Sequence, residues 1–284
     1  MDAKFLYKNL DRAFIRKRMN DDWSKMPCRE YLTNSFKKKH MGLVLDNCTE
    51  IKQVYTAVFP SKKVIDFILK SNKTNVLLFT HHPMDWNLKE RVYPFSGLDK
   101  DYLERLKKNK ISLYTLHVPL DSNGPYSTSV NLAKKLGLYV LKEFNEYHGV
   151  LVGVICTTKI DSIQELNKLV SKKIGHKTKL YKYGSSKINN GLVAIVAGGG
   201  NDKDTLKELS KNEINTFITG ITKQVKSYPP SIDAHKTAKK HKINLIGATH
   251  YSTEKFACTA MVNYFKKLGL KCSFIKDNPC MNDM

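Results

Sequence analysis

Six residues of types that bind metal ions or move protons lie in three short stretches, each directly after an apolar run. They are His81 and His82, His117 and Asp121, and His250 and Glu254. In the second and third stretches the acidic residue follows the histidine by four positions. Imidazole nitrogen and carboxylate oxygen suit zinc, iron, manganese or cobalt, and the lack of thiolate disfavours a structural zinc. The pattern therefore favours a metal centre with mixed nitrogen and oxygen ligands.

Three predicted strands must position these residues. The strands are short apolar and β-branched runs over Val76–Thr80, Ile111–Leu116 and Ile243–Ala248, and Pro83 ends the first just after its histidine pair. In an α/β sheet, ligands collect at the carboxyl ends of the strands, because the loops leaving that edge converge on a crevice. Neighbouring side chains on extended backbone point to opposite sides, so we expect the two adjacent histidines to serve two neighbouring ions, one each.

Four motifs extend this pattern, and they resemble those of a known family in order and in spacing, from about Gly42 to the end. They are Thr80–Pro83, His117–Asp121, Phe217–Gly220 and Thr249–Glu254. The family is the Nif-three-like dinuclear-metal family, whose members often carry the name GTP cyclohydrolase I type 2 homologue. The resemblance implies a Nif-three-like α/β fold, with two α/β lobes and a dinuclear metal site in the cleft between them. It also implies a toroidal homohexamer.

The resemblance further implies which residues hold the metal. Its ligands would be His81, His82, Asp121, His250 and Glu254, with His117 beside them as a catalytic acid/base or as support for a ligand or water. Five ligands give two ions three apiece only if carboxylates bridge, and Asp121 and Glu254 are the natural bridges. Bridging carboxylates hold divalent ions roughly 3.5–4 Å apart. We therefore expect two divalent ions per chain, with zinc, iron, manganese and cobalt all open.

The chain divides, on this interpretation, into three parts. Residues 1–137 form an N-terminal α/β lobe, residues 138–247 a second α/β lobe, and residues 248–284 a segment that returns to the first lobe. Residues 1–40 are predicted to be mostly helical and to pack on the first lobe. Ser252 is predicted to cap the last helix, and a frayed tail is expected after a final edge strand over Lys271–Ile275.

A glycine-rich turn, Gly198–Gly200, leaves a predicted strand and enters a helix. Its backbone amides could cradle a phosphate at the helix N-terminus, although the turn lacks the lysine and hydroxyl residue of a P-loop. A tight structural turn, with Asn201 capping the helix, is the favoured interpretation.

The formal net charge of +22 on 284 residues suits an anionic partner, but the lysines are spread along the whole sequence. We expect a small anionic substrate, and nucleic acid is the less favoured partner because no RNA-binding aromatic signature or zinc finger accompanies the charge. No apolar run approaches the roughly 20 residues of a membrane span. The charged N-terminus and six cysteines without a C-x-x-C pair predict a cytoplasmic protein with reduced thiols.

Two functions of different classes follow. The first is a dinuclear metal-dependent hydrolase, in which a metal-held hydroxide attacks a nucleotide or another phosphorylated heterocycle. The GTP cyclohydrolase name comes from resemblance alone, since no residue of the motifs selects GTP. The alternative is a non-catalytic, metal-dependent binding or regulatory module.

Overall fold

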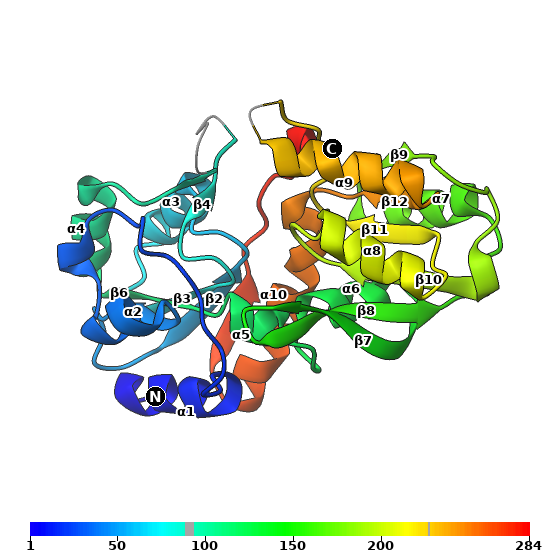
Figure 1. Cartoon of the computed structure of the whole chain (residues 1–284). Coiled ribbons are helices and arrows are strands. Elements are labelled where there is room, and N and C mark those ends of the chain that lie inside the picture. The colour runs from blue at the N-terminus through cyan, green and yellow to red at the C-terminus, as the bar shows by residue number, and fades with distance from the viewer. Residues whose placement is uncertain (89–93, 227) are drawn as a thin grey trace. The chain divides into compact units, whose positions relative to one another are not determined.

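The computed structural model describes residues 1–88, 94–226 and 228–284, and it divides into two compact units (Figure 1). Unit 1 comprises Met1–Ser122, His148–Val150 and Ala257–Asp277. Unit 2 comprises Asn123–Tyr147, Leu151–Phe256 and Asn278–Met284. The chain thus passes from one unit to the other more than once, and each unit contains its own β-sheet.

Unit 1 is built on a five-stranded sheet in which β3 lies in the centre, parallel to both neighbours. Its strands, in spatial order, are β1 (Gly42–Leu45), β6 (Ile111–Thr115), β3 (Val76–Thr80), β2 (Gln53–Ala57) and β13 (Lys271–Phe274). All residues of β3 and β6 are buried, as expected for strands covered on both faces. Thr80 pairs with Thr115, so the carboxyl ends of β3 and β6 lie level and the segments after them leave the same edge.

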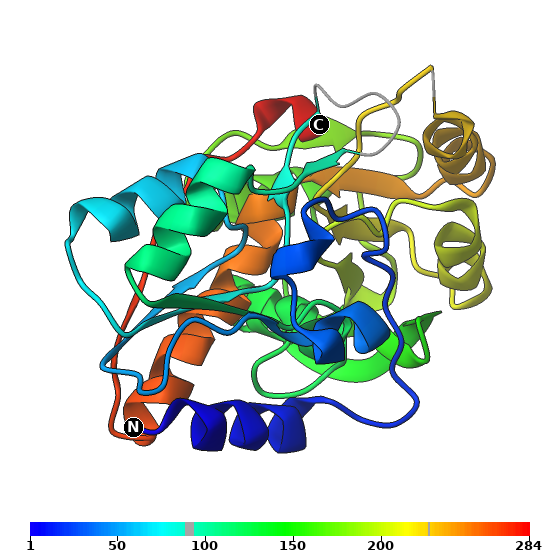
Figure 2. The same cartoon turned by 90° about the vertical axis from the view of Figure 1, so that its left-hand side faces the viewer.

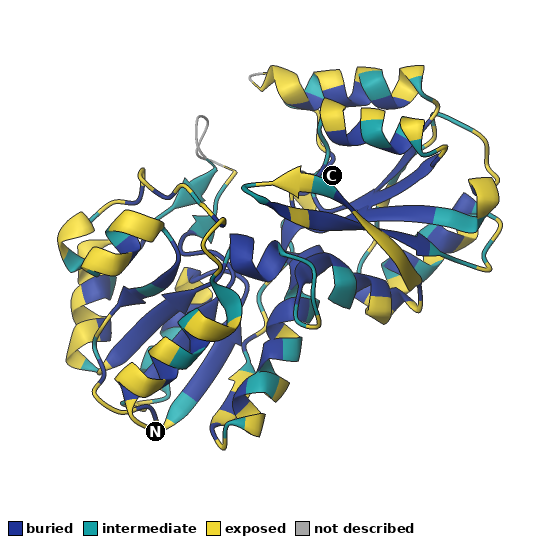
Figure 3. Cartoon of the chain, turned by 60° about the horizontal axis from the view of Figure 1, so that its bottom comes forward, coloured by how far each residue is buried: buried dark blue, intermediate teal, exposed yellow. Residues whose placement is uncertain are grey.

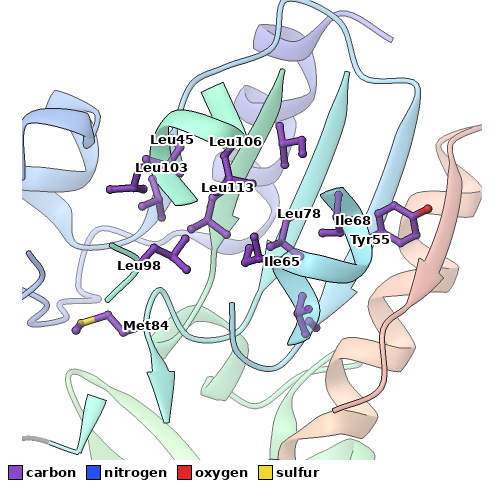
Figure 4. Close-up of a cluster of buried hydrophobic side chains, with 14 of the residues drawn as sticks. Leu45, Tyr55, Ile65, Ile68, Leu78, Met84, Leu98, Leu103, Leu106 and Leu113 are labelled. Atoms are coloured by element: carbon purple, nitrogen blue, oxygen red, sulfur yellow. The ribbon is translucent and has the colours of Figure 1, made fainter. Parts of the chain in front are cut away.

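The helices of unit 1 bury their apolar faces against this sheet. They are α1 (Ala3–Phe14), α2 (Asn34–Lys39), α3 (Lys62–Lys70), α4 (Lys100–Lys108) and the short α5 (Val118–Asp121), with a 3-10 turn at Arg29–Tyr31 and a small ribbon of β4 (Asp85–Trp86) and β5 (Phe95–Ser96). Figure 4 shows the core, where Ile65 of α3 and Leu106 of α4 meet Leu78 and Leu113 of the sheet. This packing fixes the strands that carry the histidines.

Unit 2 contains a six-stranded sheet whose three middle strands, β10, β11 and β12, run parallel. In spatial order the strands are β7 (Tyr139–Tyr147), β8 (Val150–Thr157), β10 (Leu192–Val196), β11 (Thr216–Thr219), β12 (Asn244–Gly247) and β9 (Lys179–Tyr181). The helices are α6 (Thr128–Leu136), α7 (Ile163–Ile174), α8 (Lys203–Lys211), α9 (Pro229–Lys240) and the first turns of α10 (His250–Lys267), with 3-10 turns at Asn189–Gly191 and Met281–Asp283. Figure 3 shows the inner strands buried and the outer sides of the helices exposed.

The predicted α/β fold with two lobes is confirmed, and several local details differ. Helix α6, expected in the first lobe, packs in unit 2 because Leu132, Ala133 and Leu136 belong to its core. Helix α10 starts in unit 2 and continues in unit 1 from Ala257. The edge strand before the C-terminus is present as β13, but the tail after it is not frayed, since Asp283 is fully buried.

The prediction that residues 1–40 are mostly helical is wrong between α1 and α2. Apart from the single 3-10 turn, this segment follows an irregular path (Figure 2, darker blue). It still buries Trp23 and Met26 in the core of unit 1. None of the helices in the part of the chain that the structure describes is long and apolar enough to cross a bilayer.

Candidate metal centre

His81 directly follows β3 and is completely buried. Its Nδ1 lies 2.9 Å from the carbonyl oxygen of Leu116, so that nitrogen must donate and the lone pair belongs to Nε2. Nε2 lies 3.4 Å from Oδ1 of Asp121. A metal-binding histidine commonly donates its other ring N–H to a backbone carbonyl in this way. His81 is therefore oriented as a metal ligand would be.

His82 lies closer to His81 than extended backbone would allow. The chain bends at this pair, and the two ring centroids are 4.4 Å apart. The expectation that the rings point to opposite sides is wrong for this reason. The ligand nitrogens of His81, His82 and His117 all lie within 4.8 Å of one another, so unit 1 brings three of the predicted residues together.

His117 and Asp121 lie at the two ends of the short helix α5. His117 occupies the N-cap position and Asp121 the last helical position, so one helical turn brings the two side chains together. The Nε2 of His117 lies 3.7 Å from Oδ2 of Asp121. Asp121 thus contacts two imidazoles from the ends of two neighbouring strands.

Asp21 is a functional candidate that sequence analysis missed. Both of its carboxylate oxygens lie 3.1 Å from Nδ1 of His117, and its side chain is 3% exposed. Burial by itself lowers the pKa of His117, but the charge of Asp21 and the hydrogen bond to it raise that pKa above its ordinary value. Burial raises the pKa of Asp21, whereas the charge of His117 and the same hydrogen bond lower it overall. The two directions agree on an ion pair with the proton on the imidazole.

Aromatic rings enclose the histidines of unit 1. Phe59 stacks on His82 with ring centroids 4.7 Å apart, and Phe95 lies 5.4 Å from the same ring. Trp23 meets His82 and His117 edge-on at 5.9 and 5.2 Å. This apolar lining keeps water away from the imidazoles and strengthens electrostatic interactions among them.

His250 and Glu254 are the predicted site residues of unit 2. Both are buried in the first turns of α10, and His250 Nε2 lies 3.1 Å from Glu254 Oε1. The helix begins at His250, so the prediction that Ser252 caps it is wrong. Thr249 takes that role, because its hydroxyl accepts a hydrogen bond from the Ser252 N–H at 3.3 Å. Thr249 has a φ of +60°, which is unusual for a β-branched residue.

The glycine-rich turn after β10 supports this pair. Gly198 has a φ of +71°, and a Cβ atom there would lie only 2.3 Å from Oε1 of Glu254. A Cβ at Gly220, in the third motif, would lie 2.9 Å from the Cα of His250. Both glycines therefore make room for α10. The predicted cap at Asn201 is wrong, since Asp202 accepts the N–H groups that begin α8.

Asp283 anchors the beginning of α10 from the C-terminal end of the chain. Its Oδ2 accepts the backbone N–H of His250 at 2.8 Å, and its own carbonyl oxygen accepts N–H groups from Thr222 and Lys223. Sequence analysis gave this residue no role. A carboxylate at a helix N-terminus satisfies a free donor and complements the helix dipole.

The donor chemistry of these residues fits a divalent transition metal. Unit 1 offers buried imidazole nitrogens beside one carboxylate, and unit 2 offers one imidazole beside one carboxylate. All six cysteines are free thiols, and none belongs to the groups of side chains that could hold a metal ion among the residues described. The residue set is that of a nitrogen and oxygen site for zinc, iron, manganese or cobalt.

Comparison with known proteins gives a consistent match. The family model for Duf34/NIF3 (NGG1p interacting factor 3) matches residues 31–279. A Pyrococcus horikoshii protein named GTP cyclohydrolase 1 type 2 homolog is 31% identical over 250 residues, covering 85% of this chain and 90% of the relative. A Borreliella burgdorferi protein of the same name is 33% identical over 211 residues, covering 74% of this chain and 78% of the relative.

Solved structures agree on the fold. A protein of unknown function called ybgI superposes with a TM-score of 0.76 at 20% identity, covering 99% of this chain and 100% of the other. Reduced HcgD from Methanocaldococcus jannaschii gives a TM-score of 0.68 at 23% identity, covering 98% of each chain. Asp21 and Asp283 both lie outside the residues that the family model matches.

Proposed function

Because the chain belongs to the Duf34/NIF3 family, we propose that it binds two divalent metal ions and uses them in hydrolase chemistry. The substrate would be a nucleotide or another phosphorylated heterocycle. The observation that carries the proposal is the buried cluster of unit 1, where three imidazoles converge within 4.8 Å and two of them flank Asp121. Burying imidazole lone pairs and a carboxylate together is costly unless they are hydrogen-bonded or coordinate a metal ion.

The proposed ligands are those that the family resemblance implies. Unit 1 would supply His81, His82 and Asp121, and unit 2 would supply His250 and Glu254, with the two carboxylates as bridges. The support from each unit is separate: His81 is fixed through its Nδ1–H, and Glu254 is held against Gly198. Neither arrangement is needed for packing alone, since apolar residues could fill both places.

When bound, two divalent ions would supply Lewis-acid chemistry and a positive charge that favours an anionic substrate. The chain's own residues would do the rest. His117 can hold a proton at Nε2 or accept one there, because its Nδ1 is engaged by Asp21. Trp23 and Phe95 would exclude bulk water from the histidines.

The test is turnover of a nucleotide panel that includes GTP, by protein loaded in turn with zinc, iron, manganese and cobalt. Release of a ring-opened or dephosphorylated product that depends on metal supports the hydrolase. Tight binding without turnover across the panel would instead support the alternative, a non-catalytic binding or regulatory module. The His117→Ala variant is the matched control, since it should bind metal yet lose turnover.

A homohexamer is part of the same proposal. Chains with a net charge of +22 repel one another, so a ring must bury about 1,000 Å² or more per contact to offset that repulsion. Lysines around an enclosed site would then concentrate small anions. Light scattering in moderate salt tests this, because a mass near the 32.5 kDa of one chain would reject the ring.

A further inference from the structure

We propose that the irregular segment between α1 and α2 is a working part of the metal centre, and that Asp21 is the positioning residue for His117. The inference rests on the proposed metal function and deepens it. Asp21 holds the imidazole so that Nδ1 carries its proton toward the carboxylate and Nε2 faces the other ligands. Both carboxylate oxygens of Asp21 lie 3.1 Å from that Nδ1.

Asp21 is itself held at two points, one on its carboxylate and one on its backbone. Its Oδ1 accepts the backbone N–H of Asp22 at 2.9 Å. The carbonyl oxygen of Asp21 accepts the Nδ1–H of His40 at 3.1 Å, at the end of α2. An aspartate whose backbone and carboxylate are both held loses little further freedom when it binds an imidazole, so it can set the direction of the ring.

The segment around Asp21 is anchored on unit 1 rather than loosely laid over it. Trp23 is 3% exposed and packs edge-on against His117. The N–H of Asn20 reaches the carbonyl oxygen of His148 at 3.4 Å. A Cβ at Gly149 would lie 2.5 Å from the carbonyl oxygen of Arg18. The backbones at Arg18 and Gly149 can therefore approach this closely only because residue 149 is a glycine.

The geometry has a direct chemical consequence for His117. An imidazole in water exchanges its proton between two nitrogens, and only the form with a lone pair on Nε2 can serve a metal or a metal-bound group on that side. Asp21 keeps a proton on Nδ1, so whenever His117 carries a single proton the lone pair lies on Nε2, and Trp23 packs edge-on against the ring. Both residues precede position 31, where the family match begins, so sequence motifs of the family do not report them.

The experiment measures the affinity of the metal-free full-length chain for cobalt(II), by competition with a coloured chelator. We expect Asp21→Ala to weaken cobalt binding about 10–100-fold, which is the usual effect of removing the partner that orients a metal-site histidine. Asp21→Asn retains an oxygen that can accept a hydrogen bond from the Nδ1–H of His117. This variant should therefore bind cobalt more tightly than Asp21→Ala does. Asp22→Ala, at the exposed neighbouring position, is the matched control and should bind as wild type does.

A double-mutant cycle with His117→Ala separates positioning from damage to the fold. If Asp21 acts through His117, the His117→Ala variant should already show a loss of cobalt affinity of similar size, and Asp21→Ala should change the affinity less than about 2-fold further in that background. An equal loss of cobalt affinity in the wild-type and His117→Ala backgrounds would overturn the inference. Asp21 would then support the fold in general and not His117 in particular. Unchanged binding by Asp21→Ala, with wild-type protein binding cobalt, would also overturn it and leave the metal function standing. Failure of the wild-type chain to bind cobalt would reject both.

Discussion

The candidate ligands of unit 1 and those of unit 2 are fixed by different means. In unit 1, Asp21 reaches an imidazole directly, and the histidines lie after strands whose ends a sheet holds level. In unit 2, Asp283 binds the backbone N–H of His250, and the side chains project from the first turns of a helix. A residue at a strand end has its backbone groups engaged by the sheet, so support must come through the side chain. A helix N-terminus has free N–H groups, so a carboxylate can fix the backbone instead.

This difference predicts which property changes when a supporting residue is removed from each unit. Loss of a supporting group in unit 1 should alter the direction of one ring while the sheet stays intact. Loss of one in unit 2 should loosen the start of α10, and with it both His250 and Glu254. Metal affinity should therefore be the sensitive measurement for unit 1, and stability together with metal content for unit 2.

The largest expected effect is that of Glu254→Ala. A bridging carboxylate would serve two ions, so this variant should lose most of its metal, whereas His117→Ala should bind metal more weakly than wild type but retain more of it than Glu254→Ala does, and lose function. Elemental analysis of both variants, purified side by side, makes the comparison. Equal metal loss in the two would mean that His117 is itself a direct ligand.

Asp283→Ala should destabilise the protein by about 1.5–3 kcal/mol, since it removes a buried hydrogen bond to a charged acceptor. Urea unfolding measures the change. The control is Asp233→Ala, which removes an exposed aspartate that pairs with Lys236 and should cost less than about 0.5 kcal/mol. Equal stability of the two variants would contradict a supporting role for the C-terminal turn.

The smallest expected effect on the metal centre is that of Gly198→Ala, which should lower metal content where a comparable glycine substitution does not. Gly198 and Gly175 both have positive φ, and alanine at either should cost about 1–2 kcal/mol. Only at Gly198 would the new Cβ meet Glu254, because nothing lies within 4 Å at Gly175. We expect reduced metal content in Gly198→Ala alone, and equal metal content in the two variants would show that the carboxylate adapts.

The strands and the ligand types could be predicted from sequence because they carry local signals. Val76–Thr80 and Ile111–Thr115 are buried along their whole length, and such strands give continuous apolar runs that end visibly at a polar residue. The four motifs then assign the site residues that follow these strands. The edge strand predicted over Lys271–Ile275 is also present, as β13.

The supporting contacts could not be predicted in the same way. Asp21 lies in a segment without periodicity, and it meets His117 across 96 positions of sequence. Asp283 is separated from His250 by 33 positions and lies in a short tail that resembles any polar terminus. The glycines at 198–200 did indicate a tight turn. However, the same sequence pattern is expected for a turn that binds a phosphate and for a turn that makes room for a glutamate side chain. Long-range packing decides between them.

The central claim is that each chain holds two divalent metal ions, and elemental analysis tests it most directly. Full-length protein purified without chelator from metal-replete medium should contain close to two equivalents of transition metal per chain. A preparation of that kind with only trace metal would contradict the account, whatever activity the protein shows.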